Sequence, residues 1–236
     1  YVWIDSICIV QNDRDDWTKE AAIMGAIYEN SLLTISATTA HDSTTGFLQK
    51  RRRRFKPIPL EHKSVNPNLN QPIVLRPWLQ SWTKSVEGDT SPLSSRAWVL
   101  QERLLPPRTL HFGQERIFWE RRRALVPEGD CYHDIDLKRR SYRRVAEASA
   151  PSPHSIENLH KTWFYIVQNY SIRNLTFQSD KFVAISGIAR RMHALLGGNT
   201  YLVGLCRNDL LHGMLWTAAR NGKRNSDYVA PSWSWA

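Results

Sequence analysis

Residues 1–37 read YVWIDSICIVQNDRDDWTKEAAIMGAIYENSLLTISA, and this stretch indicates the fold class. Residues 1–10 are almost continuously apolar, which is typical of a strand buried on both faces of a sheet. Residues 32–37 hold β-branched side chains in partial alternation and predict a second strand. Between them, Asn12 or Asp13 can cap a helix with a stripe of apolar residues. The stripe consists of Trp17, Ala21, Met24 and Tyr28. Strand, helix and strand in this order predict a right-handed crossover in a parallel sheet, and so an α/β fold.

The rest of the chain divides into an irregular stretch, a hairpin and a helical region. Residues 41–93 are rich in proline and are expected to form a loop-rich insertion, with one strand near residues 72–76. Residues 108–119 predict a β-hairpin, and apolar spacing from residue 155 onward predicts two helices. We therefore expect a domain core over residues 1–125 and a helical C-terminal region over residues 126–236 that closes on it. A core that starts inside a buried strand is expected to lack its first elements.

Composition limits the classes of function. The net charge of +10 permits binding to nucleic acids or other anions, but the arginines are widely spread. The dense run Lys50–Arg54 predicts a solvated loop, with a nuclear address or a phosphate contact as alternatives. Three widely spaced cysteines make neither a disulfide framework nor a metal knuckle, which fits a reducing compartment. No apolar run is long enough to span a membrane. We expect a cytoplasmic protein without metal or membrane association, and nucleic-acid binding is unlikely because no helix-turn-helix or base-stacking motif accompanies the charge.

Residues 94–108 read SSRAWVLQERLLPPR and predict a short helix that ends at the two prolines. Trp98 and Glu102 are four residues apart, about one helical turn, so their side chains leave from the same face. An aromatic wall beside a carboxylate is suited to binding a sugar and stabilising positive charge. The alternative is that Trp98 is a core residue and Glu102 an exposed helix charge.

Four stretches of the chain resemble, in order, blocks of the fungal heterokaryon-incompatibility (HET) domain family. They are residues 1–37, SSRAWVLQERLLPPRTLHFGQERIFWE at residues 94–120, YSIRNLTFQSDKFVAISGIA at residues 170–189, and APSWSWA at residues 230–236. An earlier block of the family, Ser-Tyr-x-Trp-Gly, does not occur in the sequence, which agrees with a core that lacks its first elements.

The resemblance implies a function and a site. HET domains act in fungal self/non-self recognition, a form of innate immunity, and trigger programmed cell death. They are remotely similar to TIR domains, which have a flavodoxin-like parallel sheet, and several of which cleave NAD with a helical glutamate preceded by Trp or Cys. Carried over to this chain, Glu102 is the catalytic residue and Trp98 binds substrate. Asp5 and Ser6, expected outside the carboxyl end of the first strand, line the same pocket, unless Asp5 only caps a neighbouring loop.

The chemistry expected of Glu102 is the hydrolysis of NAD, with NAD as substrate and no cofactor. Its nicotinamide is already a cationic leaving group, so the bond to ribose needs a carboxylate that stabilises an oxocarbenium-like transition state more than it needs an acid. The resemblance also implies self-association or a signalling partner. Two alternatives stay open: a self-associating signalling module without catalysis, and a basic nucleic-acid-binding protein.

Overall fold

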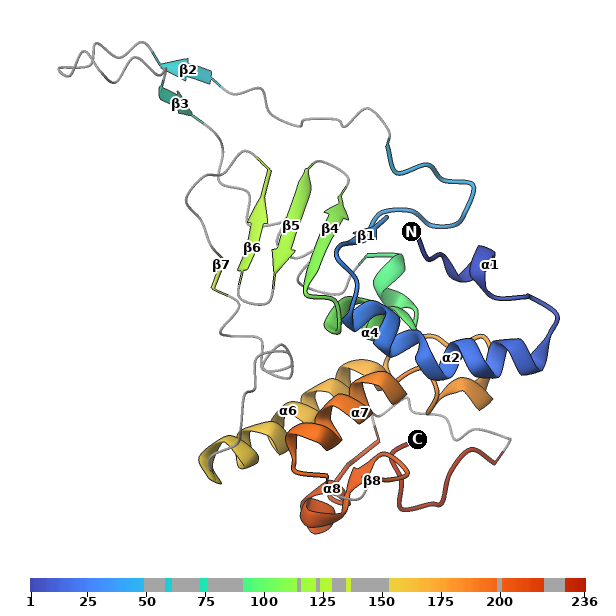
Figure 1. The fold of residues 1–236 in the computed structure, drawn as a ribbon. Helices are drawn as coiled ribbons and strands as arrows, with labels where there is room; N and C mark the ends of the chain where they lie inside the picture. Colours follow the sequence, from blue (N-terminus) through green and yellow to red (C-terminus); the bar gives the residue numbers. More distant parts are fainter. Residues whose placement is uncertain are drawn as a thin grey trace.

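The computed structural model describes residues 1–48, 58–60, 73–75, 91–113, 116–121, 124–128, 135–136, 153–198, 201–218 and 228–236. These residues form a mixed α/β fold (Figure 1). The α-helices are α1 (Asp5–Cys8), α2 (Arg14–Glu29), α4 (Val99–Leu104), α6 (Pro153–Ser171), α7 (Ser186–Leu195) and α8 (Leu210–Gly213). The 3-10 helices are η1 (Leu93–Ser95), η4 (Gln178–Asp180) and η5 (Arg207–Asp209). The strands are β1 (Thr34–Ser36), β2 (Ile58–Leu60), β3 (Ile73–Leu75), β4 (Arg108–Phe112), β5 (Ile117–Arg121), β6 (Ala124–Pro127), β7 (Ile135–Asp136), β8 (Tyr201–Leu202) and β9 (Leu205–Cys206).

The main sheet is mixed, in the order β1-β4-β5-β6-β7. The pair β1–β4 is parallel, with Thr34 opposite Thr109, whereas β4–β5, β5–β6 and β6–β7 are antiparallel. The hairpin predicted over residues 108–119 is therefore confirmed. The prediction of a flavodoxin-like parallel sheet holds for one strand pair only. Strands joined by short turns must run antiparallel, and only β1 and β4 are separated by a connection long enough to let them run parallel.

The predicted first strand, residues 1–10, is wrong. These residues form the short helix α1 within an extended segment, and none of them pairs with a described strand. Their apolar side chains are largely exposed, with Val2 at 80%, Ile7 at 75% and Val10 at 61%. An apolar run becomes a buried strand only where strands or helices cover it, because the ladder hydrogen bonds and the buried faces both need partners. In the region that the structure describes, the parallel neighbour of residues 34–36 is β4 instead.

Helix α2 matches its prediction in position but not in packing. Asp13 is its N-cap, and the Asp13 carboxylate accepts the backbone N–H groups of Asp15 and Asp16 at 2.9 and 3.0 Å. The helix packs on α7 and α4 instead of the sheet. Gly25 makes the approach to α7 possible, because a Cβ atom built there would lie 2.7 Å from the Cα of Gly187. Met24 is buried as expected, whereas Trp17 is only partly buried.

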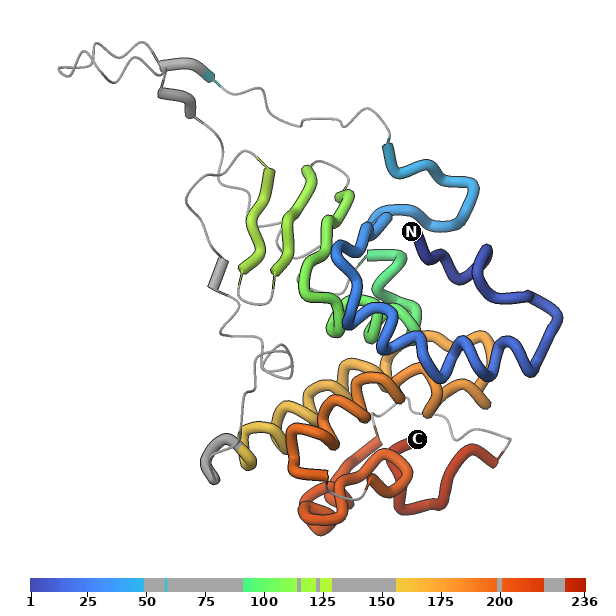
Figure 2. The backbone as a smooth tube through the Cα atoms, viewed as in Figure 1, coloured from blue at the N-terminus to red at the C-terminus, as the bar shows by residue number. Residues whose placement is uncertain are grey.

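The elements lie in successive layers (Figures 1 and 2). The sheet is at one end, α2 and α4 follow it, α6 and α7 run side by side beneath them, and α8 and β8 lie at the other end. One core cluster joins α4 with α6 and α7. Trp163, Ile166 and Ile185 are at most 1% exposed in it, which confirms the predicted helical layer. Phe182, predicted in the same layer, is only partly buried.

The C-terminal region is helical, as predicted, but α7 starts at Ser186, after η4 and a turn. Residues 201–206 form a tight hairpin in which Val203 and Gly204 have positive φ angles of 43° and 96°. The Gly204 carbonyl accepts hydrogen bonds from the indole N–H groups of Trp163 and Trp235, both at 2.9 Å. The closing segment around Trp235 therefore packs on the body, although it forms no strand.

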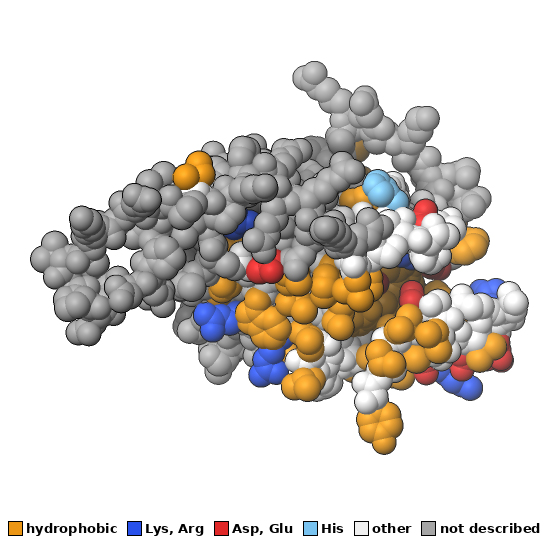
Figure 3. Space-filling model, turned by 90° about the horizontal axis from the view of Figure 1, so that it is seen from above, with side chains coloured by type: hydrophobic (Ala, Val, Ile, Leu, Met, Phe, Trp, Pro, Cys, Tyr) orange, Lys and Arg blue, Asp and Glu red, His pale blue; other side chains and the backbone are white. Residues whose placement is uncertain are grey.

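Part of the proline-rich insertion lies outside the described residues, including the Lys50–Arg54 run. The strand predicted near residues 72–76 is confirmed as β3, which pairs with β2 in an antiparallel ribbon. Several large apolar side chains of the N-terminal segment and of β1 are exposed, and Figure 3 shows hydrophobic side chains gathered on the face seen from above.

Candidate active site

Helix α4 presents the predicted pair of residues much as the sequence suggests. Trp98 is the N-cap of α4 and has helical backbone angles, φ −58° and ψ −36°, so Glu102 follows it by about one turn. The segment before the helix is fixed by residue 174: the Ala97 N–H donates to the Asn174 carbonyl at 2.9 Å, and the Asn174 N–H donates to the Ser95 carbonyl at 2.7 Å. The start of α4 is therefore anchored to the chain that follows α6.

Glu102 lies in a cluster of ionisable groups from three other segments. Burial raises the pKa of its carboxyl group to about 7, and the negative charge of Asp5 adds to the rise. The positive charge of Arg96 and a hydrogen-bonding interaction with Tyr28 act in the opposite direction on this pKa. Glu102 is thus neither a core residue nor a fully solvated helix charge, because it is partly buried beside a second carboxylate. A carboxyl group that is about half ionised near neutral pH is typical of a reacting group.

Asp5 and Ser6 reach this region from a different element than predicted. Asp5 is the first residue of α1, and its Oδ1 accepts the backbone N–H of Ser6 at 2.7 Å. Both residues are exposed. After burial, the charge of Asp5 contributes to the raised pKa of both Glu102 and Tyr28. For Ser6 the observed interaction is the backbone one with Asp5.

Trp98 packs between helices. Its ring meets that of Trp17 of α2 in a T-shaped contact, with centroids 6.2 Å apart, and it borders the main core. Aromatic contacts of this kind favour a fixed relative position of the two elements. Trp98 therefore braces α4, which presents Glu102, against α2.

Sequence reasoning missed three side chains of this cluster: Trp3, Tyr28 and Arg96. Tyr28 has its pKa raised by burial and by the charges of Glu102 and Asp5, so its hydroxyl stays protonated and is a permanent donor. The Trp3 ring meets the Tyr28 ring edge-on at 5.7 Å. The apolar spacing of the sequence places Tyr28 in the apolar stripe of the helix. Tyr28 lies one residue before the end of α2, and this position was the sequence signal that could have indicated a role in the cluster.

A second polar cluster lies between the sheet and α4. His111 Nε2 is 2.5 Å from Glu120 Oε2, and Arg103 Nε is 3.8 Å from the same oxygen. The Nδ1 atom of His111 is 3.3 Å from the Thr38 hydroxyl. Glu120 is 1% exposed and Arg103 is 7% exposed, so a buried charge pair joins α4 to β5. Arg103 directly follows Glu102, and this pair therefore helps to fix the helix that carries the candidate residue.

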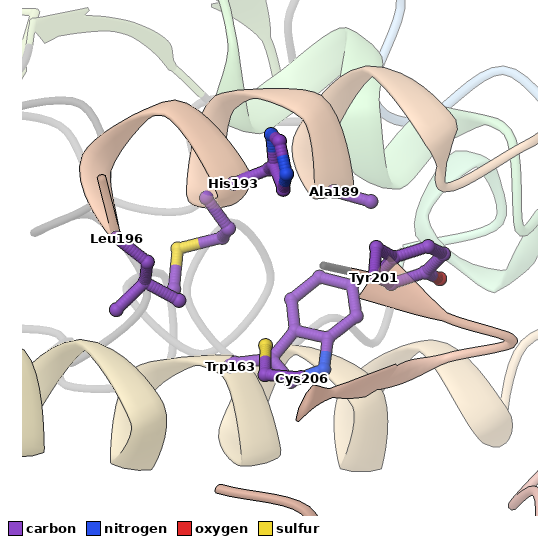
Figure 4. Close-up of a pocket in the computed structure, with 7 residues that line it drawn as sticks. Trp163, Ala189, His193, Leu196, Tyr201 and Cys206 are labelled. Atoms are coloured by element: carbon purple, nitrogen blue, oxygen red, sulfur yellow. The ribbon is translucent and has the colours of Figure 1, made fainter. Parts of the chain in front are cut away.

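A small pocket lies in the C-terminal region (Figure 4), and none of the predicted site residues lines it. It lies between α6, α7 and the β8–β9 hairpin. Its lining is mainly apolar and consists of Trp163, Ala189, Met192, His193, Leu196, Tyr201 and Cys206. Burial raises the pKa of the Cys206 thiol to about 11, which leaves it protonated and unreactive at neutral pH.

We compared the chain with known protein families to test the resemblance of its four sequence blocks to HET domains. Residues 1–102 match the family model of the heterokaryon incompatibility protein (HET). The match ends at Glu102 and includes Asp5, Ser6, Tyr28, Arg96 and Trp98, so the whole candidate cluster lies in the HET segment. No curated protein and no solved structure gives a significant match. Among the described residues there is no group of three or more potential metal ligands, and no helix there is long and apolar enough to cross a membrane.

Proposed function

We propose that the HET segment is a self/non-self recognition domain that triggers cell death by hydrolysing NAD, with Glu102 as the catalytic residue. The observation that carries the proposal is the Glu102 carboxyl group, partly buried one turn after Trp98 and next to Asp5, with a pKa of about 7. The proposal is argued from the site and not from the sheet, because the same chemistry occurs on different folds.

The reaction needs one bond to break and one to form. The C1′–N bond of the nicotinamide ribose breaks, and nicotinamide leaves as a neutral base with the electron pair. The Glu102 carboxylate stabilises the positive charge that develops on the ribose. Water then attacks C1′ and loses a proton, giving ADP-ribose. Because the ionised form of Glu102 is the active one, the rate should rise as the pH increases through about 7.

The second candidate is a signalling module that acts by self-association without catalysis. The exposure of Val2 and Ile7 in the N-terminal segment and of Leu32 before β1 favours it, since large apolar patches often mark interaction surfaces. Both candidates predict cell death on assembly, and they differ in whether NAD is consumed.

The substitution Glu102→Gln separates the two candidates because it keeps the shape of the side chain and removes its charge. With the chain brought together by a fused oligomerising tag, we expect NAD loss in the parent and a rate about 100- to 1,000-fold lower in Glu102→Gln. Glu157→Gln is the matched control, because Glu157 is exposed on α6 and pairs with Lys161. If Glu102→Gln kills as well as the parent and neither protein consumes NAD, the non-catalytic candidate is correct.

A further inference from the structure

We propose that Ser36 is a nucleophilic hydroxyl that accepts an acyl group from small activated esters, and that a relay of hydrogen bonds through Thr38, His111 and Glu120 activates it. The relay joins side chains of β1, β4 and β5 and of the residues just after β1, and these strands lie side by side in the main sheet (Figure 1). This activity is additional to the proposed hydrolysis of NAD and uses none of the residues assigned to that reaction.

The sheet places the members of the relay at one edge. Strands β1 and β4 run parallel, and Ser36 lies opposite His111 in their register. Ser36 is the last residue of β1 and His111 the last but one of β4, so both lie at the carboxyl ends of a parallel pair. This is the end of the strands where α/β sheets bind ligands. Glu120 of β5 lies on the same face as His111, because it pairs with Thr109, two residues earlier in β4.

The distances between these side chains form a continuous path. The Ser36 hydroxyl oxygen is 3.1 Å from that of Thr38, which is 3.3 Å from His111 Nδ1. On the other side of the ring, His111 Nε2 lies 2.5 Å from Glu120 Oε2. Thr38, His111 and Glu120 are 4%, 3% and 1% exposed, whereas Ser36 is only partly buried. A substrate therefore reaches the relay at Ser36.

The Glu120 carboxylate sets the direction of the relay. A carboxylate only accepts hydrogen bonds, so His111 donates from Nε2, and the neutral ring then accepts at Nδ1. The Thr38 hydroxyl donates to Nδ1 and accepts from Ser36, although the Ser36 carbonyl, 3.4 Å from the Thr38 oxygen, competes for the Thr38 proton. A hydroxyl linked in this way to a base that a third group orients is the arrangement of an activated nucleophile.

The acyl transfer balances with these groups alone. The Ser36 oxygen forms a bond to the acyl carbon, and the bond from that carbon to the leaving oxygen breaks, so that this oxygen departs as an anion with the electron pair. The Ser36 proton passes to the Thr38 oxygen while the Thr38 proton passes to His111 Nδ1. Glu120 stabilises the imidazolium that results, and the product is an ester of Ser36.

The surroundings of Ser36 favour an uncharged donor. Residues 31–40 carry no charged side chain. Enzymes that transfer phosphoryl groups stabilise the charge on the phosphate with basic groups close to the nucleophile. An acyl group on a good leaving oxygen therefore fits this segment better than a phosphoryl group.

The test measures the acetylation of individual serines. The probe is p-nitrophenyl acetate, and peptide mass spectrometry compares Ser36 with Ser43, an exposed serine in the same molecule. We expect Ser36 to react at least about 100-fold faster than Ser43, the usual scale of general-base catalysis. Thr38→Val removes the hydroxyl and should abolish this difference. Thr38→Ser keeps the hydroxyl and should retain it, which separates proton transfer from packing.

Two outcomes of the acetylation experiment overturn the proposal. Either Ser36 reacts no faster than Ser43 in the parent protein, or Ser36 in Thr38→Val reacts as fast as in the parent. Neither outcome affects the proposed hydrolysis of NAD, because that reaction depends on Glu102.

A measurement on the parent protein keeps the test decisive if Thr38→Val disturbs the fold. In protein labelled with ¹⁵N at histidine, the His111 ring is assigned through its bonds to the backbone. At neutral pH the ring should carry a proton on Nε2 and none on Nδ1. A proton on Nδ1 would leave no acceptor for Thr38, and the relay would then not exist.

Discussion

At the scale of single residues, Glu102 is a position where function and stability conflict. Burial and Asp5 raise the pKa of its carboxyl group from an ordinary value near 4.5 to about 7. Between these two values the folded protein binds more protons than the unfolded protein, so the free energy of unfolding falls as the pH rises. Above pH 7 this loss of unfolding free energy is complete, because the folded protein then holds the ionised group in an environment that disfavours it. Strained or destabilising groups of this kind are expected at functional sites.

Glu102→Gln should therefore stabilise the protein at high pH although it is expected to lower the rate about 100- to 1,000-fold. We expect the free energy of unfolding to increase by up to about 3 kcal/mol at pH 8, and by much less at pH 5. Urea unfolding of parent and variant at both pH values measures the difference, and Glu157→Gln should show no comparable gain. A loss of stability in Glu102→Gln that is equal at pH 5 and pH 8 would mean that the carboxylate is well accommodated in the fold.

At the scale of elements, the crossing of α2 and α7 determines where Tyr28 lies. The crossing depends on two glycines, Gly25 and Gly187, whose backbones approach too closely for a side chain. A Cβ atom on Gly187 would also lie 2.8 Å from the side-chain oxygen of Gln101, which is fully buried in α4. The three helices therefore meet at one point, and a change there displaces the helices that carry both Tyr28 and Glu102.

Gly25→Ala should separate α2 from α7 and cost about 1–3 kcal/mol of unfolding free energy, because overpacking forces backbone shifts that outweigh the gain in helix propensity. Gly46→Ala is the matched control, since a Cβ atom there has open space around it. Urea unfolding at neutral pH measures both. Equal stability of Gly25→Ala and the parent would show that α2 and α7 leave room for a Cβ atom at position 25, contrary to the distance of 2.7 Å between that atom and the Cα of Gly187.

The elements also show which features sequence patterns can predict. The helix over residues 14–29 and the hairpin over residues 108–119 were predicted because caps, apolar spacing and turn residues are local signals. The strand over residues 1–10 was predicted wrongly because an apolar run does not reveal whether another strand lies beside it. In the candidate site, the sequence predicts Glu102 and Asp5, whereas the apolar spacing of the helix places Tyr28 in an apolar stripe. Besides burial, the charge of Glu102, 74 positions away in the chain, raises the pKa of Tyr28, and no local pattern encodes that interaction.

At the scale of the whole molecule, the HET segment shares its core with the part of the chain that follows it. The cluster that buries Leu100 and Leu104 of α4 is completed by side chains of α6 and α7, and Tyr28 and Trp98 pack against the same cluster. The family match ends at residue 102, but the packing does not. The backbone hydrogen bonds between the start of α4 and Asn174 cross the same boundary. The candidate site is thus supported by helices beyond the matched segment.

Residues 1–125 alone should therefore not fold cooperatively, although they contain the complete HET match. Without α6 and α7, Leu100 and Leu104 lose the side chains of these helices from their core cluster, and burial of apolar surface is the main favourable term in folding. Urea unfolding followed by near-ultraviolet circular dichroism should give a broad, non-cooperative change for this fragment. Co-expression with residues 126–236 should restore a single transition, because the contacts between the two parts need no covalent link. A cooperative transition of residues 1–125 alone, with the Trp98 environment of the full chain, would mean instead that the helical region only covers a core that is already stable.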